Sequence, residues 1–513
     1  MSNTTSAEMA GRHSGIAFST AVIMVSVSAA GVGTLAWSYF PSIFAAAVVA
    51  PAVVGLTWWL LKSPVRCMYA LVIALPLEAT AVLEVGFTLR IAYALMGLCC
   101  VSTWLARRRL VIERDSTTPA LMLFVLICTA SMVQLVIFPP PEIVNLQSSL
   151  GLRASGLRVF VQLFLLLLHV AFFFNVLVLL RDKAQIQTAV RLYAVTAVVV
   201  AAYGVYQLVA ITYDLPLKNI TNAISTGGEG IAGIPYASSL FAAIRPRSTF
   251  QEPANLGLFL LSALAILLIY QPFAGPRRRF TQYSSILVLV WGIIVTVSRG
   301  TYLGLLLILV LLLVTGWSRK TSPHTLVVVL LSIAAFAAVV FPVMAVMSHG
   351  ASSMTGMLAG RFVGSEMANE ARREYLPVLL AVWQKHPILG VGLGAYGAYG
   401  AAELQTPTMM SAHGVWWSVL VETGLLGLVT YMWFVGAWFK QVYRRSFLGA
   451  DRELRALLAG LVLAMAGVTF EFLFMCDRMP TYVWFLLALG CSASNLSVRN
   501  SGADRPALGV DQR

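Results

Sequence analysis

Charged residues are scarce in this chain. They make up 11% of its 513 residues, whereas soluble domains have about a quarter. Apolar residues make up 59%, and they form long runs that short basic segments interrupt. A soluble fold is therefore excluded, and the natural unit of structure is the membrane-spanning helix.

Cysteine is also rare, and its placement excludes two kinds of structure. The six cysteines form no CxxC motif and no spacing of the kind that binds zinc. Most of them lie within apolar runs, so we interpret them as small packing residues. No P-loop, HExxH motif, Ser/His/Asp order or acidic metal cluster stands out either. We therefore expect no disulfide framework, no metal and no other cofactor.

Apolar runs of the length that a bilayer requires recur along the chain. A hydrocarbon core of about 30 Å takes about 20 helical residues. The first run, from Ile16 to about Trp37, is too long for the core of a cleaved signal peptide, so we take it as an uncleaved span. We predict an all-α polytopic membrane protein with about 14 (12–14) transmembrane helices. The predicted spans lie near residues 16–36, 40–61, 66–77, 87–105, 119–138, 157–180, 188–213, 254–271, 283–298, 301–316, 324–347, 414–439, 455–474 and 481–497.

The basic residues predict the orientation of these spans. The chain has a net charge of +14, and 23 of its 35 lysines and arginines fall in one set of alternate loops, nearly all of them short. Such loops remain on the cytoplasmic side. Both termini are then cytoplasmic, and most of the basicity is a topological signal and a contact with anionic lipid rather than a nucleic-acid surface.

The other cations lie on the opposite, outer side, where the positive-inside rule gives no reason to keep them. Arginine dominates this group, and its planar guanidinium is suited to phosphate or carboxylate. We therefore expect an anion site on the outer face. The twelve residues are Arg90, Arg153, Arg158, Lys218, Arg245, Arg247, Arg299, Arg361, Arg372, Arg373, Lys385 and Arg478.

Two of the expected outer loops are long, and long loops in a compact membrane protein tend to be functional. The expected order is N-terminal transmembrane helices in residues 1–213, an outer loop in 214–253, transmembrane helices in 254–347, a long outer loop with short helices in 348–413, transmembrane helices in 414–497 and a disordered cytoplasmic tail in 498–513.

Two groups of arginines lie where the chain re-enters the membrane. Arg245, Arg247 and Glu252 come directly before a predicted span. They suggest an anion clamp in which Glu252 orients an arginine, although arginines that extend to lipid headgroups are the alternative. Arg299 lies in a tight turn between two apolar runs. A charge there needs a polar cavity or a partner, unless it only anchors the turn at the interface.

A third group lies in the long outer loop. Arg361, Arg372 and Arg373 occur with three glutamates at near-helical spacing. A solvated helix face with ordinary ion pairs explains most of these residues equally well. That explanation is weakest for Arg372 and Arg373, because the apolar stretch from Leu376 follows them closely.

His413 lies where the long loop enters a predicted helix, and imidazole can act as a base near neutral pH. A purely structural role is the alternative for this isolated histidine. Glu422 follows nine residues later, which on a regular helix means a rotation of about 900° and a rise of about 13 Å. The two therefore form no dyad, and Glu422 is a separate intramembrane acid with a partner on a neighbouring helix. The glycines of residues 390–394 either bring backbone amides to a phosphate or form a flexible turn.

These motifs follow one another in a specific order. The chain has RxRSTFxEPxN before a span, a span that ends in SRG, Arg372 ahead of HPILGVGLG, and His413 at the start of a span that contains ExGLLG. From Arg245 to about Gly427, this order resembles the O-antigen ligase and Wzy-type polysaccharide polymerase superfamily. In the ligases asparagine and an aromatic residue usually follow the histidine, whereas here Gly414 follows and Trp416 stands nearby.

The resemblance implies a GT-C-like, metal-independent, inverting glycosyltransferase of the bacterial inner membrane. Its donor is a glycan on undecaprenyl pyrophosphate, its acceptor is a glycan hydroxyl on the periplasmic face, and a chain-length regulator or flippase is a suggested partner. By resemblance, His413 is the candidate base, and Arg247, Arg299 and Arg372 are candidates to bind the diphosphate. Further substrate-binding candidates are Arg245, Glu252, Arg361, Arg373 and Glu422.

Three other functions remain open beside a polymerase. A ligase would transfer the glycan to lipid A–core, but the EP after RSTF and the number of spans favour a polymerase. A flippase or exporter of lipid-linked glycans would need a charged path through both leaflets, whereas the candidate residues gather on the outer face. A peptidoglycan polymerase of the shape, elongation, division and sporulation type would use a loop aspartate, and residues 348–413 contain none.

Overall fold

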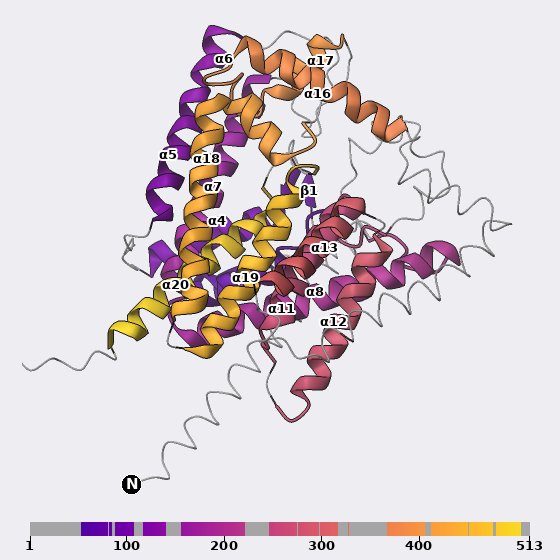
Figure 1. The fold of residues 1–513 in the computed structure, drawn as a ribbon, viewed down its shortest axis with the longest axis vertical. Coiled ribbons are helices and arrows are strands. Elements are labelled where there is room, and N and C mark those ends of the chain that lie inside the picture. Colours follow the sequence, from indigo (N-terminus) through magenta and orange to yellow (C-terminus); the bar gives the residue numbers. More distant parts are fainter. Residues whose placement is uncertain are drawn as a thin grey trace, which may run out of the picture.

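The computed structural model confirms a helical membrane protein (Figure 1). Within the described residues the chain forms fourteen helices and one pair of short strands. The structure describes residues 53–80, 82–84, 88–106, 116–139, 155–220, 246–273, 275–296, 298–315, 327, 367–405, 412–449, 451–475 and 479–503. The predicted spans near residues 16–36 and 324–347, and most of the span near 40–61, lie outside these ranges.

The elements follow the apolar runs of the sequence. Six helices are long and apolar enough to cross a membrane, with α5 and α6 counted as one, and four shorter apolar helices accompany them. The elements are α3 (Pro64–Ala74), β1 (Val82–Glu84), β2 (Thr88–Arg90), α4 (Ile91–Leu105), α5 (Thr117–Ser131), α6 (Val133–Ile137), α7 (Ser155–Leu179), α8 (Lys183–Thr212), α11 (Pro253–Ile269), α12 (Arg278–Val295), α13 (Arg299–Val314), α16 (Met367–Lys385), α17 (Tyr396–Glu403), α18 (Val415–Leu448), α19 (Arg452–Glu471) and α20 (Thr481–Ala503).

One part of the first half departs from the prediction. The helix expected from about residue 87 begins only at Ile91, because β1 and β2 pair as an antiparallel hairpin before it, with Val82 opposite Arg90. Short apolar runs do not distinguish a strand from the end of a helix by periodicity alone. The chain is therefore helical except for this hairpin within the part that the structure describes.

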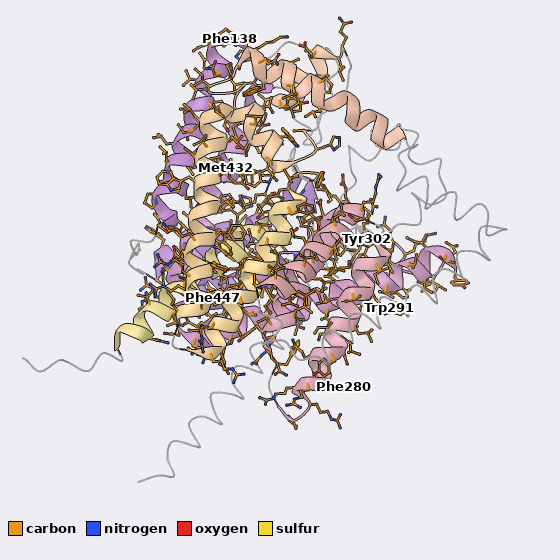
Figure 2. The ribbon with its side chains drawn as sticks, viewed as in Figure 1. Phe138, Phe280, Trp291, Tyr302, Met432 and Phe447 are labelled. Atoms are coloured by element: carbon orange, nitrogen blue, oxygen red, sulfur yellow. The ribbon has the colours of Figure 1, made fainter. Side chains whose placement is uncertain are left out.

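Large apolar side chains cover the outside of the bundle (Figure 2). Phe138, Met432 and Phe447 lie on its periphery and are 49%, 54% and 41% exposed. Monomeric soluble proteins rarely expose large apolar areas. Together with the long apolar helices, this surface identifies a multi-pass membrane protein.

The core forms around α11, which packs against α8, α12, α13 and α19. Small residues allow the helices to approach closely, as they do in membrane bundles generally. A Cβ atom added at Gly460 of α19 would lie 3.0 Å from the Ile266 Cα atom of α11. Trp438 of α18 lies against Gly490 of α20, and its indole N–H donates to the Leu487 carbonyl at 2.8 Å.

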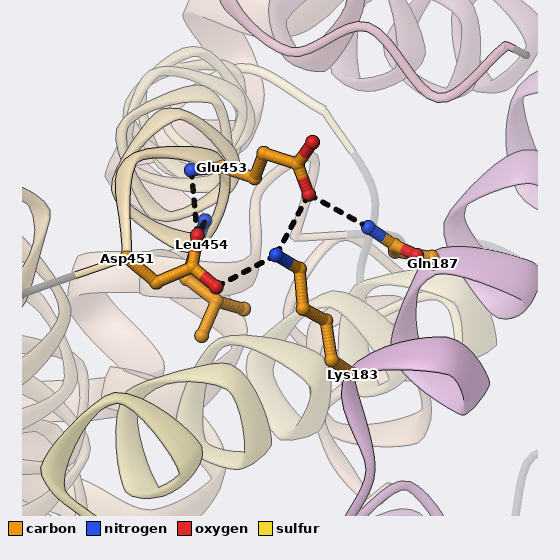
Figure 3. A network of polar contacts seen from close by, with 5 residues as sticks. All are labelled: Lys183, Gln187, Asp451, Glu453 and Leu454. Atoms are coloured by element: carbon orange, nitrogen blue, oxygen red, sulfur yellow. Dashed lines mark hydrogen bonds and ion pairs between the residues drawn. The ribbon is translucent and has the colours of Figure 1, made fainter. Parts of the chain in front are cut away.

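A polar network joins α8 to α19 where both helices begin (Figure 3). Lys183 Nζ lies 2.7 Å from the Asp451 carboxylate and 2.8 Å from the Glu453 carboxylate. Asp451 also caps α19 by accepting from the Glu453 and Leu454 amides. Gln187 donates to Glu453 at 3.0 Å. By the distribution of basic residues, this is the end of the bundle expected to face the cytoplasm.

The long helix α18 is broken at Gly424, where the backbone has φ 68° and ψ −168°. This left-handed region is accessible mainly to glycine. A break inside a membrane bundle leaves backbone groups that protein must satisfy, and residues 387–392 do so. Four backbone hydrogen bonds join the two segments: Val391 N–H to Val421 O (3.0 Å), Gly392 N–H to Glu422 O (2.9 Å), Leu425 N–H to Pro387 O (2.9 Å) and Leu426 N–H to Ile388 O (3.3 Å).

We predict that Gly424→Ala destabilises the protein by more than about 2 kcal/mol. The new Cβ atom would lie 2.1 Å from the Ile388 carbonyl oxygen, in a backbone conformation unfavourable for alanine. Gly436→Ala is the matched control, because a Cβ atom there meets nothing within 4 Å. The thermal unfolding midpoint in detergent should fall clearly for the first variant and stay constant or rise for the second. Equal midpoints would mean that the inserted segment does not constrain α18.

Candidate functional site

The turn that carries Arg247 is held from two sides. Gln207 of α8, which is 2% exposed, accepts hydrogen bonds through Oε1 from the amides of Arg247 (3.0 Å) and Ser248 (2.7 Å). Ser248 has a positive φ of 51°, and its hydroxyl donates to the Val200 carbonyl at 2.9 Å. The buried side of the turn therefore has its polar groups paired with α8.

The other side of the turn contacts the segment between α3 and β1. Thr249 donates through Oγ1 to the Pro76 carbonyl at 2.7 Å, and its own carbonyl accepts from the Ala79 amide at 2.9 Å. Phe250 is fully buried, and its ring centroid lies 6.4 Å from that of Tyr482 at the start of α20. The sequence R-S-T-F thus forms one fixed turn in contact with α8, the segment between α3 and β1, and α20.

The Arg247 side chain is half-buried. Burial lowers the pKa of Arg247, and Tyr203 acts in the opposite direction. The pKa of an arginine starts so far above neutrality that Arg247 remains a cation at neutral pH. A partly desolvated guanidinium interacts more strongly with an anion than one in bulk water, which suits this residue to the binding of phosphate oxygens.

A second charged group adjoins this turn. Arg90, at the end of the hairpin, donates through Nη2 to Gln251 Oε1 at 3.3 Å and lies 5.8 Å from the Tyr93 ring centroid. Glu78 is 7% exposed. Burial raises the pKa of Glu78, the charge of Arg90 opposes that rise, and the charge of Glu252 adds to it. Glu78 thus interacts electrostatically with Arg90 and with Glu252 of the R-S-T-F-Q-E segment, and Arg90 contacts Gln251 of the same segment.

Arg299 lies at the first position of α13, after Ser298 at the N-cap, and is half-buried. The next turn of this helix packs tightly against its neighbours. The Thr301 hydroxyl donates to Glu471 Oε2 at 3.4 Å, and a Cβ atom at Gly257 of α11 would lie 2.3 Å from Thr301 Oγ1. Thr301 therefore connects α13 to both α11 and the end of α19.

His413 directly precedes α18, as its sequence position predicted, and has a φ of 49°. A Cβ atom at Gly414 would lie 2.9 Å from the Phe472 carbonyl oxygen at the end of α19, so a larger side chain would require the neighbouring backbone to shift. Trp416 and Trp417 donate from their indole N–H groups to the carbonyls of Thr469 (3.0 Å) and Leu473 (3.2 Å). His413 is therefore held beside the end of α19.

Three of the candidate motifs thus converge on one end of the bundle. The starts of α11 and α13 meet at Thr301, and the starts of α13 and α18 both contact the end of α19. Arg247 and Glu252 precede α11, Arg299 begins α13, and His413 precedes α18. We call this group of helix starts, with the α19 end between them, the site end.

The remaining candidates are placed less completely. Arg372 and Arg373 lie within α16, where their backbone is described, whereas Arg245 and Arg361 lie outside the described residues. Glu422 lies in the regular part of α18 before the break, half-buried and apart from His413 along the helix.

The glycines of residues 390–394 have a structural use. Gly390, Gly392 and Gly394 have positive φ angles, and the amides of Val391 and Gly392 donate to carbonyls of α18. Those two amides are therefore not available to a phosphate.

Among the described residues, no group of three or more His, Cys, Asp or Glu side chains could hold a metal ion. Two contributors to the site have no motif of their own in the sequence. Gln207 is one glutamine in an apolar helix, and Glu471 is one acid at the end of another. A polar residue within a predicted span is the signal that could have found both.

Fold and site together define a polytopic membrane protein in which the helix starts next to Arg247, Arg299 and His413 lie at one end. Residues 284–432 match the family described as O-antigen ligase. An O-antigen polymerase of Salmonella muenchen is 24% identical over 200 residues, which are 38% of this chain and 47% of that protein. The match thus spans about half the length of that relative. Part of the chain is thus similar to O-antigen ligases and to an O-antigen polymerase.

We predict that Gln207→Leu destabilises the protein by about 2–4 kcal/mol, because it leaves the two buried amides of the Arg247 turn without an acceptor. Gln187→Leu, in the same helix, is the control, because Gln187 is partly exposed and contacts the exposed Glu453. Thermal unfolding in detergent should separate the two variants. A similar small effect of both would contradict the role given to Gln207.

Proposed function

We propose that this protein is a polysaccharide polymerase of the bacterial inner membrane. It transfers a glycan from undecaprenyl pyrophosphate to a hydroxyl of an acceptor glycan. The proposal is supported by the helix starts next to Arg247, Arg299 and His413, which lie together at the site end, in a chain that is similar in part to O-antigen ligases and polymerases.

The chemistry needs a group that accepts a proton and groups that stabilise a leaving diphosphate. The acceptor hydroxyl oxygen attacks the anomeric carbon of the donor while His413 takes the hydroxyl proton. The bond from that carbon to the diphosphate oxygen breaks, and its electron pair leaves with undecaprenyl pyrophosphate. Arg247, Arg299 and Arg372 stabilise the charge on that diphosphate. Attack opposite the leaving group inverts the anomeric centre.

The other candidates have supporting roles in this proposal. Glu252 and Arg245 complete the anion clamp before α11. Arg361 and Arg373 contact the glycan or the diphosphate from the long loop. Glu422 acts within the membrane bundle. The reaction uses no metal. The site end faces the periplasm, since the basic loops lie at the other end, and both termini are cytoplasmic. A chain-length regulator or flippase works beside the enzyme.

A polymerase is favoured over a ligase by the EP sequence after RSTF and by the relative named O-antigen polymerase. Transfer to lipid A–core is the second candidate, supported by the description of the matched family. An exporter of lipid-linked glycans is a third function of another class, with no covalent step.

We predict that His413→Ala lowers the transfer rate by about 10²–10⁴-fold, the usual contribution of a general base. Arg247→Ala should lower the rate by about 10²–10³-fold through lost charge stabilisation. Arg279→Ala is a control at the opposite end of the bundle, exposed at the start of α12, and should leave the rate unchanged. Rates are measured in nanodiscs with an undecaprenyl pyrophosphate oligosaccharide. Full activity of both site variants would refute the mechanism.

Product analysis separates the three functions. A ladder of lengthened glycans without any added acceptor is the expected result and indicates a polymerase. A single transfer that requires lipid A–core would instead indicate the ligase. If no glycosidic bond forms, and cells with His413→Ala or Arg247→Ala keep their polysaccharide, the enzyme is excluded and the exporter remains.

A further inference from the structure

Glu471 is a buried acid that the proposed mechanism does not use. It is the last residue of α19, and its exposure is 0%. Transfer of a carboxylate into an apolar bundle carries a large free-energy penalty unless it is paired, and acids retained there usually have a function. The surroundings of Glu471 indicate what that function is.

The carboxylate lies against the first turns of α13. Thr301 donates to Oε2 at 3.4 Å, whereas Oε1 has no hydrogen-bond partner among the described residues. Cβ atoms added at Gly300 and Gly304 would lie 3.5 Å from Oε2 and 3.0 Å from Oε1. The two glycines therefore leave a slot on α13, and the carboxylate fills it.

A carboxylate in this slot has a physical advantage over an apolar side chain. Its Oε2 atom accepts from the Thr301 hydroxyl, which an apolar side chain in the same place would leave without this acceptor. Thr301 in turn lies against Gly257 of α11. Glu471 thus connects the helix that begins with Arg299 to the helix that follows Glu252.

The other side of the α19 end carries the start of α18. Gly414 lies against the Phe472 and Leu473 carbonyls, and Trp417 donates to Leu473. Phe472 and Leu473 are the two residues that directly follow Glu471 along the chain. The side chain of Glu471 therefore fixes α13, while the backbone that follows it fixes the position of His413.

We propose that Glu471 is a positioning residue, which sets Arg299 against His413 by holding the Ser298-Arg299-Gly300 turn on the end of α19. The inference rests on the proposed function in so far as Arg299 binds the donor diphosphate. Its structural part, the fixed turn, can be tested without glycosyl transfer.

The first test is a double-mutant cycle on the transfer rate. Glu471→Ala should lower the rate on the order of 10–100-fold, because a small displacement of a positioned group has effects of this size. In the Arg299→Ala background the same change should cost less than about 2-fold, because residues that act through one another are not additive. Glu471→Gln keeps an acceptor for Thr301 and should stay within about 3-fold of the wild type. Additive losses would overturn the inference and leave the proposed function intact.

The second test measures the turn itself. Ser298 is 4% exposed, so a Ser298→Cys protein should react slowly with a charged thiol reagent, as followed by peptide mass spectrometry. Adding Glu471→Ala should raise the labelling rate at least about 5-fold, the effect expected from a locally opened segment. Glu453→Ala, at the other end of α19, should not change that rate.

Thr301→Val removes the same hydrogen bond and replaces Glu471→Ala if that variant does not fold. Thr301→Ser retains the hydroxyl and should label as slowly as the parent. An unchanged labelling rate in folded Glu471→Ala or Thr301→Val overturns the inference. If the wild type transfers no glycan, the proposed function fails, whereas the labelling rates still decide whether Glu471 holds the turn.

Discussion

A polar backbone group inside an apolar bundle has to find its partner within the protein, and the site depends on this constraint. It applies wherever a helix starts, ends or breaks, because each such point leaves amides or carbonyls without a helical partner. Residues 387–392 satisfy the break in α18, and Gln207 satisfies two amides of the Arg247 turn. The hydrogen bonds that satisfy these backbone groups thus also fix the segments that carry the candidate residues.

The end of α19 is the point that the motifs share. The indole N–H groups of α18 donate to backbone carbonyls at the end of α19 and just beyond it. The side-chain carboxyl group of Glu471, the last residue of α19, accepts from Thr301 of α13. Arg299 and His413 are more than one hundred residues apart in the sequence, yet both are positioned by this one helix end. Short motifs that are widely separated in the sequence are the expected result when each motif supplies one face of a common contact.

The sequence predicted the helical membrane class and the order of the motifs well, because span length and apolar composition follow directly from the thickness of the bilayer. His413 before a helix was predictable for the same reason. The hairpin before α4 was not, because its short strands lie within an apolar stretch. Neither were the contacts of Gln207 and Glu471, since pairing between distant helices leaves no local pattern. The glycines of residues 390–394 were visible, but their close contacts were not: Gly390 lies against the break in α18, Gly392 against Leu135 and Gly394 against Gln162.

The hydrogen bonds between residues 387–392 and the break in α18 also determine which part of the chain could be exchanged with a relative as one unit. These residues follow the long helix α16, yet their hydrogen bonds make them part of the membrane bundle. A chimera between relatives should accordingly carry residues 386–426 as a single cassette, because a junction inside that range would pair one parent's insert with the other parent's broken helix.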